Sequence, residues 1–74
     1  MAEVHIHLAE NIRFARQNAG ETQWDLAEVC GVSPTAIANY ESGLRQPDLV
    51  TLARIAEHYH LTLDALVLGK LHKS

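Results

Sequence analysis

The chain has 74 residues, of which 47% are hydrophobic, and this predicts one folded domain over residues 1–74, with short N- and C-terminal extensions. Six Lys and Arg against nine Asp and Glu give a net charge of −3, which argues against an anionic partner. No uncharged apolar run approaches the roughly 18 residues of a membrane span, and no signal-peptide pattern opens the chain. The single cysteine cannot form an internal disulfide, which predicts a cytoplasmic protein.

An apolar stripe at steps of three and four residues predicts a first helix. The stripe consists of Val4, Leu8, Ile12, Ala15 and Ala19. Gly20 can adopt the left-handed conformation that ends such a helix. The alternation over residues 4–8 leaves a short strand or a mobile arm open as an alternative for its start.

A Thr-x-x-Asp signal from Thr22 to Asp25 predicts the start of a second helix, because the hydroxyl can cap a backbone N–H group. Its inner face is formed by Leu26, Ala27 and Cys30. Gly31 is expected to end this helix with a positive φ, a conformation that costs a residue with a Cβ roughly 1–2 kcal/mol.

Ser33 and Pro34 predict the start of a third helix, with the serine as cap and the proline at the first position, where no N–H is needed. Ile37 and Tyr40, three residues apart, are expected to hold this helix against the core. Gly43 ends it.

Two more helices follow a loop over residues 44–47. Asp48 is expected to cap a fourth helix and Thr62 a fifth, which Gly69 closes. The fourth helix carries the stripe Leu49, Leu52, Ile55, Ala56 and Tyr59, and the fifth carries Leu63, Leu66 and Val67. Five helices joined by short turns predict an all-α fold.

Residues 22–43 read as two short helices that meet at a sharp glycine turn, which is the build of a helix-turn-helix. The second helix, over residues 33–42, would enter the major groove of DNA with its short outer side chains, Pro34, Thr35, Ala38 and Asn39. Asn39 can pair with adenine through two hydrogen bonds, Thr35 can donate or accept one, and Pro34 can touch a thymine methyl. The alternative is a solvated helix face without base contacts.

The longer pattern is Gln23-x-x-Leu26-Ala27-x-x-x-Gly31-Val32-Ser33-x-x-x-Ile37-x-x-Tyr40-Glu41-x-Gly43-x-Arg45-x-Pro47. It is accompanied by Ile12-Arg13-x-x-Arg16 upstream, and by Leu49-x-x-Leu52-x-x-Ile55-Ala56 and Leu61-x-x-Asp64-x-Leu66 downstream. Over residues 8–68 the chain thus resembles the phage repressor/Cro-type (Xre-like) helix-turn-helix family, a five-helix DNA-binding domain.

The resemblance implies roles for individual residues. Gln23, beside Thr22, would bind a DNA phosphate at the start of the second helix, and Arg45 would meet a backbone phosphate. The base-reading positions would be Pro34, Thr35 and Asn39, with Ala38 on the same face. Arg16 and Glu41 would form an ion pair inside the domain. That pair has independent support, because a carboxylate in the last turn of a helix is disfavoured by the helix dipole and needs a cation.

The chain departs from the family pattern at several positions. Pro34 stands where a long polar residue is usual, which removes one direct base contact. Glu21 and Asp25 flank the expected phosphate contact and would repel DNA. Phe14 and Trp24 occupy positions that are usually polar. We expect them to pack against each other, with a DNA sugar or a partner protein as alternative contacts for Trp24.

The histidines and the cysteine suggest chemistry that their surroundings do not support. His5 and His7, like His58 and His60, are two residues apart and would point to different faces of a helix, so no metal site is expected. Cys30 is expected to be a small buried thiol. No cofactor and no enzymatic activity are predicted.

The sequence therefore predicts a sequence-specific regulator of transcription, a repressor that binds double-stranded DNA as a homodimer. Val67, Leu68 and Leu71 exceed what one small core needs and are the expected dimer interface, unless they only cap the core. Two alternatives remain. One is a helical protein-interaction module, favoured by the acidic charge and by Trp24. The other is an antitoxin that binds DNA and a partner protein.

Overall fold

The computed structural model describes residues 6–71, and within this range it contains five α-helices and no strand. The helices are α1 (Leu8–Asn18), α2 (Gln23–Cys30), α3 (Pro34–Ser42), α4 (Leu49–His58) and α5 (Leu63–Leu68). The predicted all-α class is therefore confirmed. Ile6 and His7 belong to no strand, and the expectations placed on Val4 and His5 lie outside the described residues.

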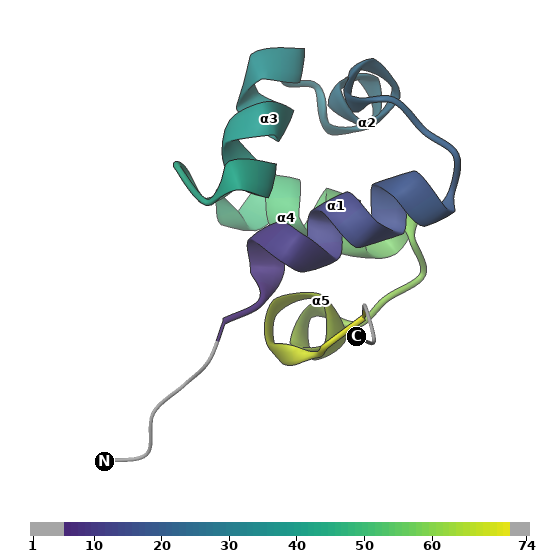
Figure 1. The fold of residues 1–74 in the computed structure, drawn as a ribbon, viewed down its shortest axis with the longest axis vertical. Helices are drawn as coiled ribbons and strands as arrows, with labels where there is room; N and C mark the ends of the chain where they lie inside the picture. The colour runs from purple at the N-terminus through teal and green to yellow at the C-terminus, as the bar shows by residue number, and fades with distance from the viewer. Residues whose placement is uncertain (1–5, 72–74) are drawn as a thin grey trace.

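In the fold, α1 runs between two groups of helices, with α2 and α3 on one side and α5 on the other (Figure 1). α3 packs against α1 and α2, while α4 packs against α2 and α5. Every helix contributes to the buried core, which consists of Leu8, Ile12, Leu26, Ala27, Cys30, Ile37, Ile55, Ala56 and Leu66. α3 is thus supported from behind by α1 and from the side by α2.

The predicted caps of four helices are present. At α2, the Thr22 hydroxyl accepts a hydrogen bond from the Asp25 backbone N–H at 3.1 Å, and the Asp25 carboxylate accepts one from the Thr22 N–H at 2.8 Å. Ser33 and Thr62 accept equivalent bonds at the starts of α3 and α5, at 3.1 and 3.0 Å. The Asp48 carboxylate accepts from the Thr51 N–H at 2.8 Å. Each cap satisfies a backbone donor that the helix leaves unpaired.

The two carboxylate caps predict a loss of stability in acid. Hydrogen bonds from the backbone lower the pKa of Asp25, through Thr22, and of Asp48, through Thr51. Because the folded pKa lies below the unfolded value of about 4, this contribution is complete above that value and disappears as pH falls through the folded pKa. We expect Asp48→Asn, which keeps a capping oxygen, to flatten the fall in stability between about pH 5 and 2. Urea unfolding across this pH range measures the change in the free energy of unfolding, with Asp64→Asn as the control. Equal slopes for Asp48→Asn and the wild type would contradict it.

The turn between α2 and α3 has the conformation that the sequence predicts. Gly31 has φ +70°, and the chain reverses so that the Val32 N–H donates to the Ala27 carbonyl at 3.1 Å. The sequence did not predict the part played by Arg54 of α4, whose guanidinium donates to the Cys30 carbonyl at 3.0 Å. This bond satisfies a carbonyl at the end of α2, where a positive charge also complements the helix dipole.

Three members of the predicted apolar stripes were placed wrongly. Leu49 and Leu63 are 72% and 41% exposed, because each is the first residue of its helix and projects past the core. Ala19 is exposed, because α1 ends at Asn18. In α4 the core position one turn before Ile55 belongs to Thr51, which is 6% exposed.

Asn11, which is fully buried in α1, is the main polar contact of the core. Its side-chain amide donates to the carbonyls of Leu66 at 2.8 Å and Gly69 at 2.7 Å, and its Oδ1 accepts from the Leu71 N–H at 3.2 Å. These bonds fix the end of α5 to the start of α1. The role of Asn11 was not predicted from the sequence.

Candidate nucleic-acid interface

The four expected base-reading residues share the outer side of α3. Thr35 is exposed, and Pro34, Ala38 and Asn39 are half-buried, whereas Ile37 on the inner side is fully buried. The side chain of Asn39 makes no hydrogen bond within residues 6–71, although its backbone carbonyl accepts from the Arg45 N–H at 3.2 Å. Its amide is therefore available to a ligand in front of the helix.

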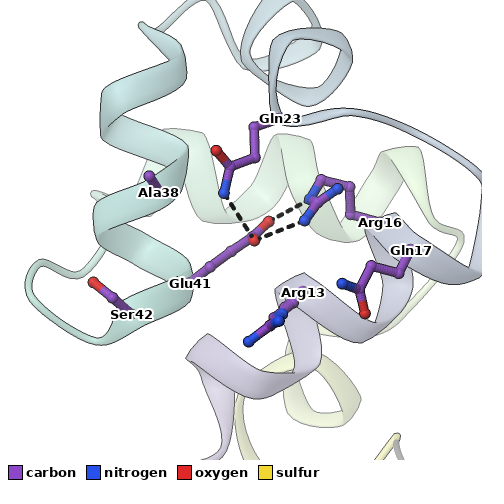
Figure 2. Close-up of a pocket in the computed structure, with 7 residues that line it drawn as sticks. All are labelled: Arg13, Arg16, Gln17, Gln23, Ala38, Glu41 and Ser42. Atoms are coloured by element: carbon purple, nitrogen blue, oxygen red, sulfur yellow. Dashed lines mark hydrogen bonds and ion pairs between the residues drawn. The ribbon is translucent and has the colours of Figure 1, made fainter.

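A depression of about 250 Å³ lies beside this face, between α1, α2 and α3 (Figure 2). It is lined by Arg13, Arg16, Gln17, Gln23, Ala38, Glu41 and Ser42. Gln23, the expected phosphate contact, donates from Nε2 to Glu41 Oε1 at 3.3 Å. The bond fixes the side chain of the first residue of α2 toward α3. The neighbouring Thr22 hydroxyl serves as the cap.

The expected ion pair between Arg16 and Glu41 is present and is largely shielded from water. Arg16 Nε lies 2.6 Å from Glu41 Oε2 and Nη2 lies 3.0 Å from Oε1, with the two side chains 12% and 5% exposed. Arg16 Nη1 also donates to the Glu21 carbonyl at 2.7 Å. The hydrogen bond to Glu41 raises the pKa of Arg16. One guanidinium thus ties α1 to α3 and to the turn before α2.

Two exposed arginines lie near the outer face of α3. Arg45, in the loop after α3, is exposed as the phosphate-contact hypothesis requires. Arg13 is also exposed and lines the depression beside Gln23, so it is a second candidate for a phosphate contact. The family pattern includes Arg13 without a predicted role, although its spacing of three from Arg16 could have suggested one.

The acidic residues that were expected to repel DNA are both engaged within the protein. The Glu21 carboxylate lies 2.6 Å from His58 Nε2 and accepts a 2.6 Å hydrogen bond from the Tyr59 hydroxyl, so it is turned toward the end of α4. Burial and then the bond to Glu21 raise the pKa of Tyr59, which stays neutral. Asp25 is held in its capping box. Both carboxylates are therefore held in fixed positions by the protein, Glu21 at the end of α4 and Asp25 at the start of α2.

The residues expected at a dimer interface differ in what they leave exposed. Val67 packs against the core, and its carbonyl accepts from the His7 N–H at 2.8 Å. Leu71 is half-buried and its N–H is bound by Asn11. Leu68 is 47% exposed. Of the three, Leu68 offers the most surface to a second subunit, and the homodimer stays a prediction.

The expected packing of Trp24 on Phe14 is wrong. Trp24 is 74% exposed and lies in a groove with residues of α2 and α3, whereas Phe14 lies among residues of α1 and the C-terminal part of the chain.

Across the described part of the chain, no group of three or more His, Cys, Asp and Glu side chains could hold a metal ion. Cys30 is buried, and burial raises the pKa of its thiol. None of α1 to α5 is long and apolar enough to cross a membrane.

Known proteins are similar to this chain in sequence and in fold. The transcriptional regulator ImmR of Bacillus subtilis (strain 168) is 38% identical over 63 residues, which cover 85% of this chain and 49% of ImmR. The transcriptional activator BcrR of Enterococcus faecalis is 36% identical over 61 residues, 82% of this chain and 30% of BcrR. The chain thus spans about half or less of the length of these relatives.

Among solved structures, a transcriptional regulator from Listeria innocua superposes with a TM-score of 0.85 and 31% identity, over 96% of this chain and 65% of that one. The P22 c2 repressor, solved in complex with a synthetic operator, superposes with a TM-score of 0.80 and 25% identity, over 93% of this chain and 100% of that one. Residues 12–66 also match the family described as Helix-turn-helix. The chain therefore belongs to the helix-turn-helix family.

Proposed function

We propose that the chain is a sequence-specific regulator of transcription, a cytoplasmic repressor without enzymatic activity that binds double-stranded DNA as a homodimer. The observation that carries the proposal is the outer face of α3. Its inner side is anchored by the buried Ile37, and Thr35 and Asn39 face outward with polar groups that the protein leaves available. The fold shared with an operator-bound repressor supports the same conclusion.

The contacts divide into two kinds. Thr35 and Asn39 read base edges in the major groove, and Pro34 and Ala38 are small enough to let α3 approach them. Gln23, Thr22 and Arg45 hold the phosphates on either side and set the position of α3 in the groove. The hydrogen bond that Gln23 donates to Glu41 supports this division, because it orients one phosphate-binding side chain before DNA arrives.

The homodimer follows from the small size of the reading surface. One helix reads only a few base pairs, and a specific site needs about 4–10 kcal/mol of discrimination over other DNA. Two copies on half-sites about 34 Å apart supply this. Leu68, with its side chain half exposed at the end of α5, remains the best residue of the expected interface.

Binding of labelled DNA duplexes tests the proposal, with fluorescence anisotropy measured at two salt concentrations. We expect the logarithm of the affinity to fall with the logarithm of salt, with a slope of about −0.9 for each phosphate contact. Arg45→Ala weakens all sequences alike and makes the slope shallower by about one, whereas Lys70→Ala, which removes an equal charge two residues after α5, changes neither. Asn39→Ala costs about 1–3 kcal/mol of binding free energy on a duplex selected for tight binding, and it reduces the discrimination between bases at one base pair.

The same measurements separate the alternatives. A folded dimer that binds no duplex at low salt would contradict the DNA proposal and favour the protein-interaction module. Identical behaviour of Asn39→Ala and Arg45→Ala on selected and random duplexes would contradict the division between base reading and phosphate binding.

A further inference from the structure

A groove of about 350 Å³ lies on the side of α2 that faces solvent, where α2 meets the start of α3. It is lined by Trp24, Asp25, Ala27 and Glu28 of α2, by Val32 of the turn and by Pro34 of α3. Trp24 and Glu28 are one helical turn apart and therefore neighbours on the surface of α2. We call this site the Trp24 groove.

The protein gains little from Trp24. The side chain is 74% exposed, and the core is complete without it, since α2 contributes Leu26, Ala27 and Cys30. An exposed tryptophan leaves a large apolar surface in water, and tryptophans in this situation are concentrated at the centres of protein interfaces. Its exposure beside a groove therefore indicates a binding surface.

The charged residues that line the Trp24 groove indicate which kind of ligand it can bind. Its charged lining residues are Asp25 and Glu28, both acidic, and among residues 6–71 no Lys or Arg lines it. Hydrogen bonds with Thr22 lower the pKa of Asp25, which keeps this carboxylate ionised at neutral pH. Two carboxylates beside an indole repel a DNA phosphate and attract a cation. Val32 and Pro34 add an apolar wall.

We propose that the Trp24 groove binds an arginine-bearing segment of a second protein. The guanidinium stacks on the indole of Trp24 and pairs with the carboxylates of Asp25 and Glu28, while neighbouring apolar atoms rest on Val32 and Pro34. Arginine fits better than lysine, because a planar guanidinium can stack and form two parallel hydrogen bonds at once. The groove shares Pro34 with the outer face of α3, but Trp24, Asp25 and Glu28 all lie on α2, and the proposal does not depend on the DNA proposal.

The chain provides its own probe, because Trp24 is its only tryptophan. The full chain is titrated with the peptide acetyl-Ala-Arg-Leu-Arg-Ala-amide, and with the same peptide carrying neutral citrulline in place of both arginines, while tryptophan emission is recorded. We expect a saturable change with the arginine peptide and none with the citrulline peptide. Glu28→Gln weakens binding about fivefold. Glu57→Gln, an equal change on the exposed surface of α4, leaves binding unchanged.

Three results would overturn the proposal. The first is that tryptophan emission does not respond to the arginine peptide, or responds equally to both peptides. The second is that Glu28→Gln and Glu57→Gln weaken peptide binding equally, which would show only a general attraction to an acidic protein. The third is a change of emission with a mixed-sequence DNA duplex together with no response to the arginine peptide, which assigns the groove to DNA. If the full chain binds the arginine peptide but binds no DNA duplex, the DNA proposal is contradicted and the proposal for the Trp24 groove is not.

Discussion

Asn11→Ala is expected to destabilise the fold by about 3–5 kcal/mol. The substitution removes the donor for the buried carbonyl of Leu66 and the part-buried carbonyl of Gly69, and it removes the acceptor for the part-buried Leu71 N–H. A small domain has a total stability of about 5–15 kcal/mol, so this loss is a large part of the whole. Urea unfolding followed by circular dichroism measures it. Asn18→Ala, the same change at an exposed position of α1, should cost about 0.5 kcal/mol or less.

Asn11→Asp separates the hydrogen bonds of Asn11 from its packing. The introduced carboxylate is nearly the same size but points negative charge at two carbonyl oxygens, so we expect a loss at pH 7 at least as large as that of Asn11→Ala. Burial raises the pKa of such a carboxyl, and its neutral form can donate one hydrogen bond. Part of the stability relative to wild type should therefore return as pH falls from 7 towards the unfolded carboxyl pKa of about 4. Wild-type stability of Asn11→Asp at pH 7 would show that the two carbonyl bonds contribute little.

The starts of α2, α3, α4 and α5 could be predicted from the sequence because their signals are local. Thr22, Ser33, Asp48 and Thr62 each cap the helix that begins at the next residue, and Gly31 takes the positive φ expected of it. A cap involves a side chain and a backbone group only three residues apart, so neighbouring residues are enough to reveal it. The same holds for α3, whose start and end both follow from its flanking residues.

The errors came from contacts between residues distant in the sequence. A search for apolar periodicity passed over Asn11 and Thr51, because both are polar residues at core-facing positions. The spacing contained a signal for Asn11, which follows Leu8 by three and adjoins Ile12 on the predicted stripe. Glu21 could not be assigned in this way, since its partners His58 and Tyr59 lie 37 and 38 residues further along the chain.

The candidate interface was predictable to the extent that it follows from one helix and its turn. The face of α3 and the ion pair between Arg16 and Glu41 have the expected geometry. The link from Glu41 to Gln23 was not expected, and it makes the ion pair relevant to the DNA face as well as to stability. A family pattern gives the residues but not the hydrogen bonds that connect them.

Arg16→Met is the second change with a large expected effect. Methionine keeps most of the packing but leaves the Glu41 carboxylate, 5% exposed, without its cation, and we expect a loss of about 3–5 kcal/mol in the free energy of unfolding. Arg13→Met, the same change at an exposed position of α1, should cost about 0.5 kcal/mol or less. Urea unfolding of the two variants measures the difference, and equal losses would contradict a specific role for the ion pair.

The double variant Arg16→Met with Glu41→Leu distinguishes stability from positioning. Replacing both members of a buried pair by apolar residues is often neutral, so we expect the double variant to recover most of the stability that Arg16→Met loses. It does not restore the acceptor that holds Gln23 toward α3. DNA affinity should therefore remain below wild type in the double variant, although it is as well folded, and the loss should be equal on selected and random duplexes because a phosphate contact reads no sequence. Wild-type DNA affinity in a stable double variant would show that Glu41 serves the fold alone and that Gln23 needs no support from it.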